Sequence, residues 1–548
     1  MPSPSRRWTR RTFHAHCLAS GLSALAGART PAQDRWAEAA PVGAIRGEPR
    51  AEEAALAILR SGGNVADAIV TAAFTAAVAA PHQTGLGGYG GHAVLALEGG
   101  QRVVAVDFNS MAPAAARPDM FPRDAQGEVV GQRNMYGYLA AGVPGVPAGL
   151  GLILSRFGTR PLRDALQAAI ALAEEGFPLG SAAASLRASA GQLAEDEPSR
   201  ALYFRDGRPL TASDRFRNLD LARLLREMAE ANSVETFYRG AAARQIAAAF
   251  RQHGGLVTEA DLAAYEARVV EPLALAWGDW TIWTAPLTAG GVTVLQVLKL
   301  LQALDWDRQP PAEPDTWQLQ VEAMRFAWQD RLQYLGDGAD AKARELLDDR
   351  TLAAAAGQIA QAVARRQPLP VRVTSRPEIG TIHLSAVDRE GNFAALTLTH
   401  GGAFGARVTI PGLGVTLGHG MSRFDPHPEH PNAPGPHKRP LNNMCPTIVA
   451  YRGRPVLALG ARGGRKIPNA VLEVLLGLIA RSQNLAQAVA APRLHTEGTL
   501  RLFFEPSWPE GVRQALAARG YQVQTLSSAV VSAVGWLDRQ QPPQTAMR

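Results

Sequence analysis

The chain has 548 residues, of which 46% are hydrophobic and 6% aromatic, a composition ordinary for a globular protein with a sizeable core. The length allows two to four domains or one large layered enzyme. The net charge of +7 falls by four to +3 without the arginines of the first 28 residues, and no basic stripe with interleaved aromatics is present, which argues against a nucleic-acid partner.

Residues 1–28 have the layout of an export signal. A basic start contains the sequence RRTF at 10–13, a modestly apolar run follows, and the segment ends on small residues, AGA, at 26–28. The paired arginines favour a signal of the twin-arginine type. We therefore expect the protein to be exported, to the periplasm or to the outside, and this segment to be removed.

Removal of the signal takes Cys17 away and leaves Cys445 as the sole cysteine, so the mature protein cannot form an internal disulfide. The longest apolar run after the signal, residues 68–80, is far shorter than the ~20 residues that a membrane-spanning helix needs. We expect no integral membrane segment.

The part of the chain before residue 380 is predicted to be rich in helices, because apolar residues recur there at helical spacing or run on as in a buried helix. The predicted helices are residues 51–61, 66–80, 162–175, 220–232, 241–253 and 317–334. Residues 371–378 carry proline and arginine and are predicted to form an exposed connector, where cleavage or mobility is tolerated. Beyond it the pattern changes to strands: one from residue 382, a hairpin turn at 388–392, and further strands at 393–399, 447–451 and 456–460.

Residues 85–90, GLGGYG, match the dinucleotide-binding pattern, but they follow a helix and enter a strand at 92–97. This is the reverse of the context that directs a helix N-terminus at a pyrophosphate. We interpret the segment as a tight crossing of the backbone.

The proline-rich segment 424–440 contains His427, His430 and His437. Three histidines suggest a metal, but the prolines and the irregular spacing favour a surface loop. We expect neither a metal nor an organic cofactor.

The clearest candidate for a catalytic residue is Thr381, in the sequence PEIGTIHLSAVD at 377–388. It stands at the mouth of a predicted strand, where a Gly-Thr pair is usually only a turn. A hydroxyl is a poor nucleophile without a base beside it. If the chain is cut between Gly380 and Thr381, the freed α-amine, which titrates near ~8, supplies that base.

The pattern from Gly380-Thr381 through His383, Asp388-x-x-Gly391-Asn392 and Thr397-x-Thr399 resembles the start of the small subunit of the γ-glutamyltransferase (glutathione hydrolase) family. Other stretches follow in the order of that family, from about residue 47 to the end of the chain. They are residues 62–68, 81–88, 143–150, 157–159, 173–178, 438–444, 446–449 and 460–464.

The resemblance implies an α+β fold, a four-layer αββα sandwich of the N-terminal-nucleophile hydrolase type. It also implies one precursor that becomes two intertwined chains, a large one of residues 29–380 and a small one of 381–548. In this family Thr381 attacks an amide, Thr399 binds and orients its hydroxyl, and the paired Gly463 and Gly464 form the oxyanion hole. A lone Gly-Gly is otherwise a loop far more often than an oxyanion hole.

Several recognition motifs depart from the family pattern. The family's arginine that clamps the substrate α-carboxylate is Asn109 here, and its paired serines are Asn442 and Asn443, which can still donate hydrogen bonds. The motif that supplies acids for the substrate α-amino group reads GHGMSRF at 418–424, where Arg423 cannot bind an ammonium. Gly401 and Gly402 replace larger family residues, and we expect open space there.

The family reading predicts a self-processing amidohydrolase or acyltransferase that cleaves γ-glutamyl amides such as glutathione. The altered motifs favour a broader alternative, an acylase of the cephalosporin-acylase kind, with Arg423 gripping the carboxylate of a glutaryl-like acyl group that lacks an α-amine. A third reading, from another class, is a catalytically silent exported binding protein.

Overall fold

The computed structural model of the protein describes residues 42–310, 313–373 and 380–548. The predicted export signal lies outside the described residues, as do residues 374–379 of the predicted connector. Residues 41–548 form one compact unit, and the following description concerns the described residues of that unit.

Two six-stranded antiparallel sheets form the centre of this unit. In spatial order, the first contains β1 (Gly43–Arg46), β11 (Ile382–Asp388), β12 (Phe393–Thr399), β2 (Gly90–Leu97), β3 (Arg102–Asp107) and β8 (Arg268–Val270). The second contains β21 (Gln544–Met547), β20 (Val530–Gly535), β16 (Arg454–Arg462), β15 (Thr447–Tyr451), β10 (Trp280–Thr284) and β9 (Leu273–Trp277). Each sheet takes strands from both sides of residue 381, so a cut there would leave two intertwined chains.

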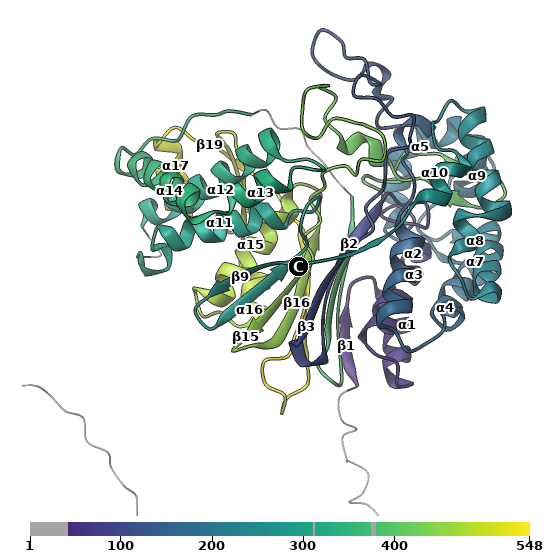
Figure 1. Cartoon of the computed structure of the whole chain (residues 1–548), viewed down its shortest axis with the longest axis horizontal. Coiled ribbons are helices and arrows are strands. Elements are labelled where there is room, and N and C mark those ends of the chain that lie inside the picture. The colour runs from purple at the N-terminus through teal and green to yellow at the C-terminus, as the bar shows by residue number, and fades with distance from the viewer. Residues whose placement is uncertain (1–41, 311–312, 374–379) are drawn as a thin grey trace, which may run out of the picture. The chain divides into compact units, whose positions relative to one another are not determined.

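Helices cover the outer face of each sheet, as Figure 1 shows. On the first sheet these are α1 (Pro49–Arg60), α2 (Val65–Ala79) and α3 (Val146–Phe157), with α4 (Leu162–Glu175), α7 (Leu219–Ala231) and α9 (Gly240–Gln252) beyond them. On the second sheet they are α11 (Gly291–Ala303), α12 (Pro314–Tyr334), α14 (Asp349–Ala364) and α15 (Lys466–Ile479). Because β11 and β12 also contact β16, the order of layers is helix, sheet, sheet, helix. The predicted α+β four-layer sandwich is confirmed.

All six predicted helices are present, and their ends lie within three residues of the predicted ones. The helix α2 illustrates why the sequence predicts them well. It begins with a capping box, in which Asn64 and Asp67 satisfy each other's backbone N–H groups. Every residue of α2 is buried, as expected for a helix that is apolar on all sides.

The predicted hairpin between β11 and β12 is also present, with the φ angle of Gly391 at 81° in its turn. The Asp388 carboxylate accepts hydrogen bonds from Asn392 N (2.9 Å), from Asn392 Nδ2 (2.9 Å) and from Val65 N (3.0 Å) at the start of α2. This one side chain therefore fixes the turn and joins the hairpin to the helix behind it.

The crossing predicted at residues 85–90 lies between α2 and β2. A Cβ at Gly87 would lie 2.4 Å from Thr416 O, and one at Gly90 would lie 2.1 Å from Phe108 O. Only glycine fits so close to a neighbouring backbone. The tight crossing is confirmed.

The space between the two sheets is filled by small residues, mainly alanine and valine, such as Val94, Ala395 and Ala458. Small side chains let two sheets approach closely. A polar group between them must therefore find a partner within the protein.

Candidate active site

Thr381 and Thr399 face each other at one end of the β11–β12 pair. The register pairs Ile382 with Leu398, so residue 381 comes opposite 399 at the next step. Thr381 Oγ1 lies 3.3 Å from Thr399 Oγ1, and Thr399 Oγ1 also accepts a hydrogen bond from Gly401 N at 2.8 Å. The contact matches the one expected between the two hydroxyls, and its catalytic role remains a prediction.

The bond expected to be cut lies at this point. The Thr381 hydroxyl contacts the carbonyl oxygen of Gly380, the group that it would attack. Thr381 has a φ angle of 153°, in a region that a β-branched residue rarely adopts, so the backbone is strained at the Gly380–Thr381 junction.

The open space expected at residues 401 and 402 is absent, and that expectation is wrong. A Cβ at Gly380 would lie 2.8 Å from Gly402 Cα and 3.0 Å from Gly401 O. The backbone that precedes the nucleophile fills the space in the uncut chain. A Cβ at Gly401 would also lie 2.8 Å from His419 Nε2, so a larger residue does not fit there.

A row of polar side chains crosses the first sheet one step in from Thr381. His383, Thr397, His92 and Asp107 are paired in register across β11, β12, β2 and β3. His383 Nδ1 lies 2.7 Å from Thr397 Oγ1, and its Nε2 lies 2.9 Å from Ser385 Oγ. Burial lowers the pKa of His383 to about 3 and that of His92 to about 4, so both rings are neutral at neutral pH.

The end of β16 lies beside this row. A Cβ at Gly460 would lie 2.3 Å from the His383 ring, so that ring packs directly on the second sheet. Gly463 and Gly464 come immediately after β16, with φ angles of 140° and 63° that favour glycine. The structure therefore puts the glycine pair after the strand that packs on β11, and its role as oxyanion hole remains a prediction.

Arg423 belongs to a short 3-10 helix, η6 (Gly420–Arg423), next to the nucleophile. Its Nη2 donates a hydrogen bond to Gly401 O, the residue whose N–H binds Thr399. The guanidinium therefore contacts Gly401, which is two residues after the predicted orienting residue, Thr399. A carboxylate at this guanidinium would lie near the reacting atoms.

The three asparagines expected to bind substrate lie in a buried network. Asn109 Nδ2 donates to Thr288 Oγ1 (2.7 Å) and to Pro440 O (2.6 Å). Asn442 Nδ2 contacts His92 Nε2 at 3.0 Å, and its Oδ1 accepts from Met444 N at 3.0 Å. Asn443 Oδ1 accepts from Arg331 Nη2 at 3.3 Å. The Nδ2 groups of Asn109 and Asn442 are therefore bound to protein groups in this structure.

The position of Asn109 explains the difference from an arginine clamp. It follows β3 beside Gly90, which pairs with Thr399, so it lies in the same row as Thr381 but three strands away from β11. Three inter-strand spacings of ~4.8 Å place it roughly 14 Å from Thr381. A long arginine could reach back across part of that distance, whereas asparagine is too short.

Sequence reasoning missed Arg462, the residue before the glycine pair. Its Nη1 donates to Gln83 Oε1 at 3.2 Å, and Gln83 O accepts from His400 N at 2.8 Å. Gln83 thus links the guanidinium to His400, the residue that follows Thr399. An arginine directly before the predicted oxyanion hole was visible in the sequence, but its neutral partner was not.

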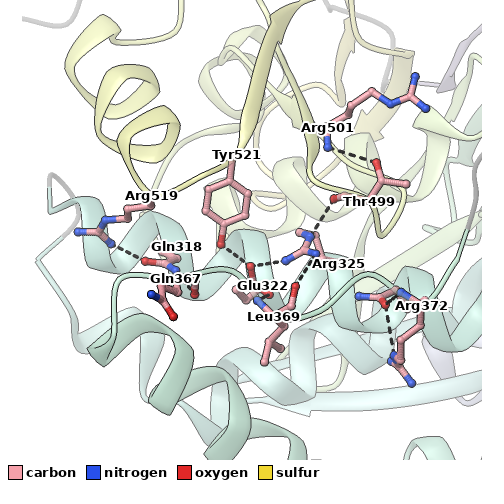
Figure 2. A network of polar contacts seen from close by, with 11 residues as sticks. Gln318, Glu322, Arg325, Gln367, Leu369, Arg372, Thr499, Arg501, Arg519 and Tyr521 are labelled. Atoms are coloured by element: carbon pink, nitrogen blue, oxygen red, sulfur yellow. Dashed lines mark hydrogen bonds and ion pairs between the residues drawn. The ribbon is translucent and has the colours of Figure 1, made fainter.

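The end of the predicted large chain is held by a stripe of side chains on α12, part of which Figure 2 shows. Four contacts bind the backbone after α14. They are Gln318 Nε2 to Gln367 O (3.0 Å), Leu369 N to Glu322 Oε2 (3.3 Å), Arg325 Nη2 to Leu369 O (2.9 Å) and Arg372 N to Gln329 Oε1 (2.7 Å). The stripe also binds the predicted small chain, because Tyr521 contacts Glu322 and Arg325 Nε donates to Thr499 O at 2.8 Å. It therefore contacts both predicted chains and holds the backbone eight residues before Gly380.

Two of the histidines of the segment 424–440, His427 and His430, have separate partners. His427 Nδ1 lies 2.6 Å from Asp425 Oδ1, and His430 Nε2 lies 2.8 Å from Leu332 O. The segment contains neither helix nor strand after residue 424, as a loop was predicted. Among the described residues, no group of three or more His, Cys, Asp or Glu side chains is arranged to hold a metal ion. In the same residues, no helix is long and apolar enough to cross a bilayer.

Known proteins resemble this chain over most of its length. The Gamma-glutamyltranspeptidase family model matches residues 51–546. The glutathione hydrolase proenzyme of Escherichia coli (strain K12) is 34% identical over 484 residues, which cover 85% of this chain and 83% of that protein. The Acylase ACY 1 proenzyme of Pseudomonas sp. (strain SE83) is 33% identical over 487 residues, which cover 87% of this chain and 86% of that protein.

Solved structures agree with these similarities. Cephalosporin acylase from Bacillus halodurans superimposes with a TM-score of 0.82 at 26% identity, covering 92% of this chain and 96% of that one. A chain of Helicobacter pylori γ-glutamyltranspeptidase gives a TM-score of 0.54 at 32% identity, covering 59% of this chain and 91% of that one. The lower score accompanies the smaller share of this chain that is covered. The family model, the relatives and the sandwich fold together establish that this chain belongs to the γ-glutamyltranspeptidase family of N-terminal-nucleophile hydrolases.

Proposed function

We propose that the protein is a self-cleaving amidohydrolase and acyltransferase in which Thr381 is the nucleophile. The observation that carries the proposal is the hydrogen-bonded series from Thr381 through Thr399 to Gly401, at the junction where the chain is strained. The relatives named above as proenzymes support a precursor that is cut into two chains.

Self-cleavage would use the same hydroxyl as catalysis. Thr381 Oγ attacks the Gly380 carbonyl carbon, the C–N bond breaks as the nitrogen takes a proton, and Gly380 is left as an ester on Oγ. Water then hydrolyses this ester and frees both the hydroxyl and the α-amine of Thr381. The residue now carries a nucleophile and a base together.

In turnover, Thr381 Oγ attacks the substrate amide while the α-amine takes the hydroxyl proton and passes it to the leaving amine. The developing oxyanion would be held by N–H groups of Gly463 and Gly464, and one such donor is commonly worth ~2.7–4 kcal/mol. Water releases the acyl group as an acid, whereas an acceptor amine takes it by transfer. Neither step requires a cofactor.

The family reading gives γ-glutamyl amides such as glutathione as substrates, and one set of observations favours a second class. The donors of Asn109 and Asn442 are bound within the protein, and Gly420 offers no acid, so the two ends of a glutamyl group lack their usual partners. The Arg423 guanidinium lies beside Gly401, and its donors are of the kind that bind a carboxylate. We infer a preference for a glutaryl-like acyl group, like that expected of an acylase.

Two measurements test the proposal. Denaturing gels of the purified protein should show two fragments, the smaller beginning at Thr381, while Thr381→Ala should remain one inactive chain. A γ-glutamyl anilide and a glutaryl anilide should then be compared as donors. Faster turnover of the glutaryl compound supports the acylase reading, and faster turnover of the γ-glutamyl compound supports the family reading.

A single uncut and inactive chain would instead indicate a silent binding protein.

Export is part of the same proposal, since residues 1–28 carry a twin-arginine pattern. Changing Arg10 and Arg11 to lysine should leave the protein in the cytoplasm, as fractionation would show.

A further inference from the structure

Arg462 ends β16 on the face that is turned toward the first sheet. Ala458 lies in the cluster between the sheets, and Gly460 packs against the His383 ring. Side chains two residues apart on a strand share a face, so Arg462 points to the same side. Its hydrogen bond to Gln83 agrees, because Gln83 binds the backbone of His400 next to Thr399.

The charge of Arg462 is poorly compensated. Its guanidinium is half-buried, and among the described residues no carboxylate lies within ion-pair distance of it. Two buried arginines, by contrast, each have a carboxylate partner: Arg439 Nη1 lies 2.7 Å from Asp107 Oδ2, and Arg325 Nη1 lies 2.5 Å from Glu322 Oε1. Burial alone lowers the pKa of Arg462, and no acid counteracts it.

A cation that is partly removed from water and hydrogen-bonded to one neutral amide loses hydration that this single bond does not fully replace. A guanidinium has five donors in a planar fork that matches a carboxylate. A charge kept in this condition beside a nucleophile is what a site for an anionic substrate group requires.

We propose that Arg462 binds a carboxylate of the substrate beside the glycine pair. This inference builds on the proposed function, since it names the substrate class of the same site. With Arg423 at Gly401, it would provide two guanidinium groups close to Thr399. The carboxylate belongs either to the acyl chain or to the amine that leaves, and both share this chemistry.

The test uses the self-cleaved enzyme and three variants. Arg462→Gln removes the charge, Arg462→Lys keeps it without the fork, and Arg454→Gln is a matched control at the exposed start of the same strand. Two substrate pairs separate the sources. Glutaryl anilide against pentanoyl anilide varies the acyl carboxylate, and glutaryl 4-aminobenzoate against glutaryl anilide varies one on the amine.

In one of the two pairs, Arg462→Gln should lower kcat/KM about tenfold or more for the substrate that bears the varied carboxylate. The other substrate of that pair should change little. A tenfold loss is what the removal of one charge-assisted contact predicts. Arg462→Lys should recover part of the loss, and Arg454→Gln should behave as wild type. A selective loss in the first pair assigns the carboxylate to the acyl chain, and one in the second assigns it to the amine. Equal losses on both members, or none, would overturn the inference.

Self-cleavage is scored separately on gels. A wild-type chain that is never cut contradicts the proposed function, whereas cut variants without selectivity contradict only the role of Arg462. If Arg462→Gln does not fold, inhibition of the wild type provides a second measurement. Glutarate should inhibit at lower concentration than glutaramide if the carboxylate is on the acyl chain, and 4-aminobenzoate at lower concentration than aniline if it is on the amine. Equal inhibition within both pairs would overturn the inference.

Discussion

Thr399→Val is the sharpest probe of the hydroxyl pair, because valine keeps the shape of threonine and removes only the hydroxyl. The change deletes the acceptor for Thr381 Oγ1 at 3.3 Å and the acceptor for Gly401 N at 2.8 Å. The first contact is longer than the usual ~2.7–2.8 Å for two hydroxyls, so its contribution to orientation is modest. The second loss leaves a buried N–H unsatisfied, at a cost of about 1–3 kcal/mol.

We therefore expect Thr399→Val to lower kcat/KM by about 5- to 30-fold, which corresponds to ~1–2 kcal/mol in the barrier. The free energy of unfolding, measured by urea titration, should fall by about 1–3 kcal/mol. Self-cleavage, followed on gels, should slow as well, since it uses the same hydroxyl.

Thr397→Val is the matched control, on the same strand and the same face. Thr397 binds His383 at 2.7 Å and does not contact Thr381, so this variant should lose stability with little change in kcat/KM once cleaved. An unchanged kcat/KM in Thr399→Val, or an equal loss in both variants, would refute the role assigned to Thr399.

Three further predictions follow from buried contacts. The pKa values of His383 and His400 are lowered to about 3 and those of His82 and His92 to about 4, mainly by burial. Histidine in the unfolded chain has a pKa near ~6.5, so below that pH the unfolded state binds protons that the folded state does not. The free energy of unfolding should therefore fall between about pH 6.5 and about pH 4, by up to ~1.4 kcal/mol per pH unit for each histidine. Urea midpoints that stay constant between about pH 7.5 and about pH 5 would contradict this. Gly460→Ala places a Cβ 2.3 Å from the His383 ring, and we expect a clear loss of thermal stability, whereas Gly511→Ala, with no atom nearby, should be neutral in a melting curve. Gln329→Ala removes the acceptor for Arg372 N and should slow the appearance of the two fragments without changing turnover of the cut enzyme. The control is Gln302→Ala on α11, whose amide binds Ala276 O. Equal rates of cleavage in the two variants would show that the Gln329–Arg372 contact does not assist cleavage.

Local features of the sequence were sufficient to predict the named helices and the hairpin. The capping box before α2 and the turn around Gly391 act within a few residues, so they can be recognised without the fold. α11 and α15 were not predicted. Nearly all of α15 is buried, and a continuous apolar run does not separate a helix from a strand by its periodicity.

The assignment of strands to the two sheets could not be predicted from such features. β10 pairs with β15 although residues from 285 to 446 separate them, and β1 pairs with β11 across an even longer stretch. The surroundings of the site depend on the same long-range pairing. The filling of the space at Gly402 by Gly380, and the neutral partner of Arg462, both involve segments that only the folded chain brings together.

The division between strands and loops explains why the reaction is better determined by this structure than the substrate is. Thr381, Thr399 and the row through His383 lie on or directly at the ends of strands, and the His383 ring packs on Gly460 of the opposite sheet. A change there would disturb the packing of the two sheets, so this part is constrained by the fold itself. Asn109, Gly420, Arg423 and Arg462 stand at strand ends or in loops, where a side chain can change without moving a sheet. A glutathione hydrolase proenzyme and an acylase proenzyme are 34% and 33% identical to this chain, so overall identity does not choose between the two reactions. We therefore propose that the charges at residues 423 and 462 carry the choice, because both are suited to a carboxylate of the substrate and neither can bind the ammonium of a glutamyl group.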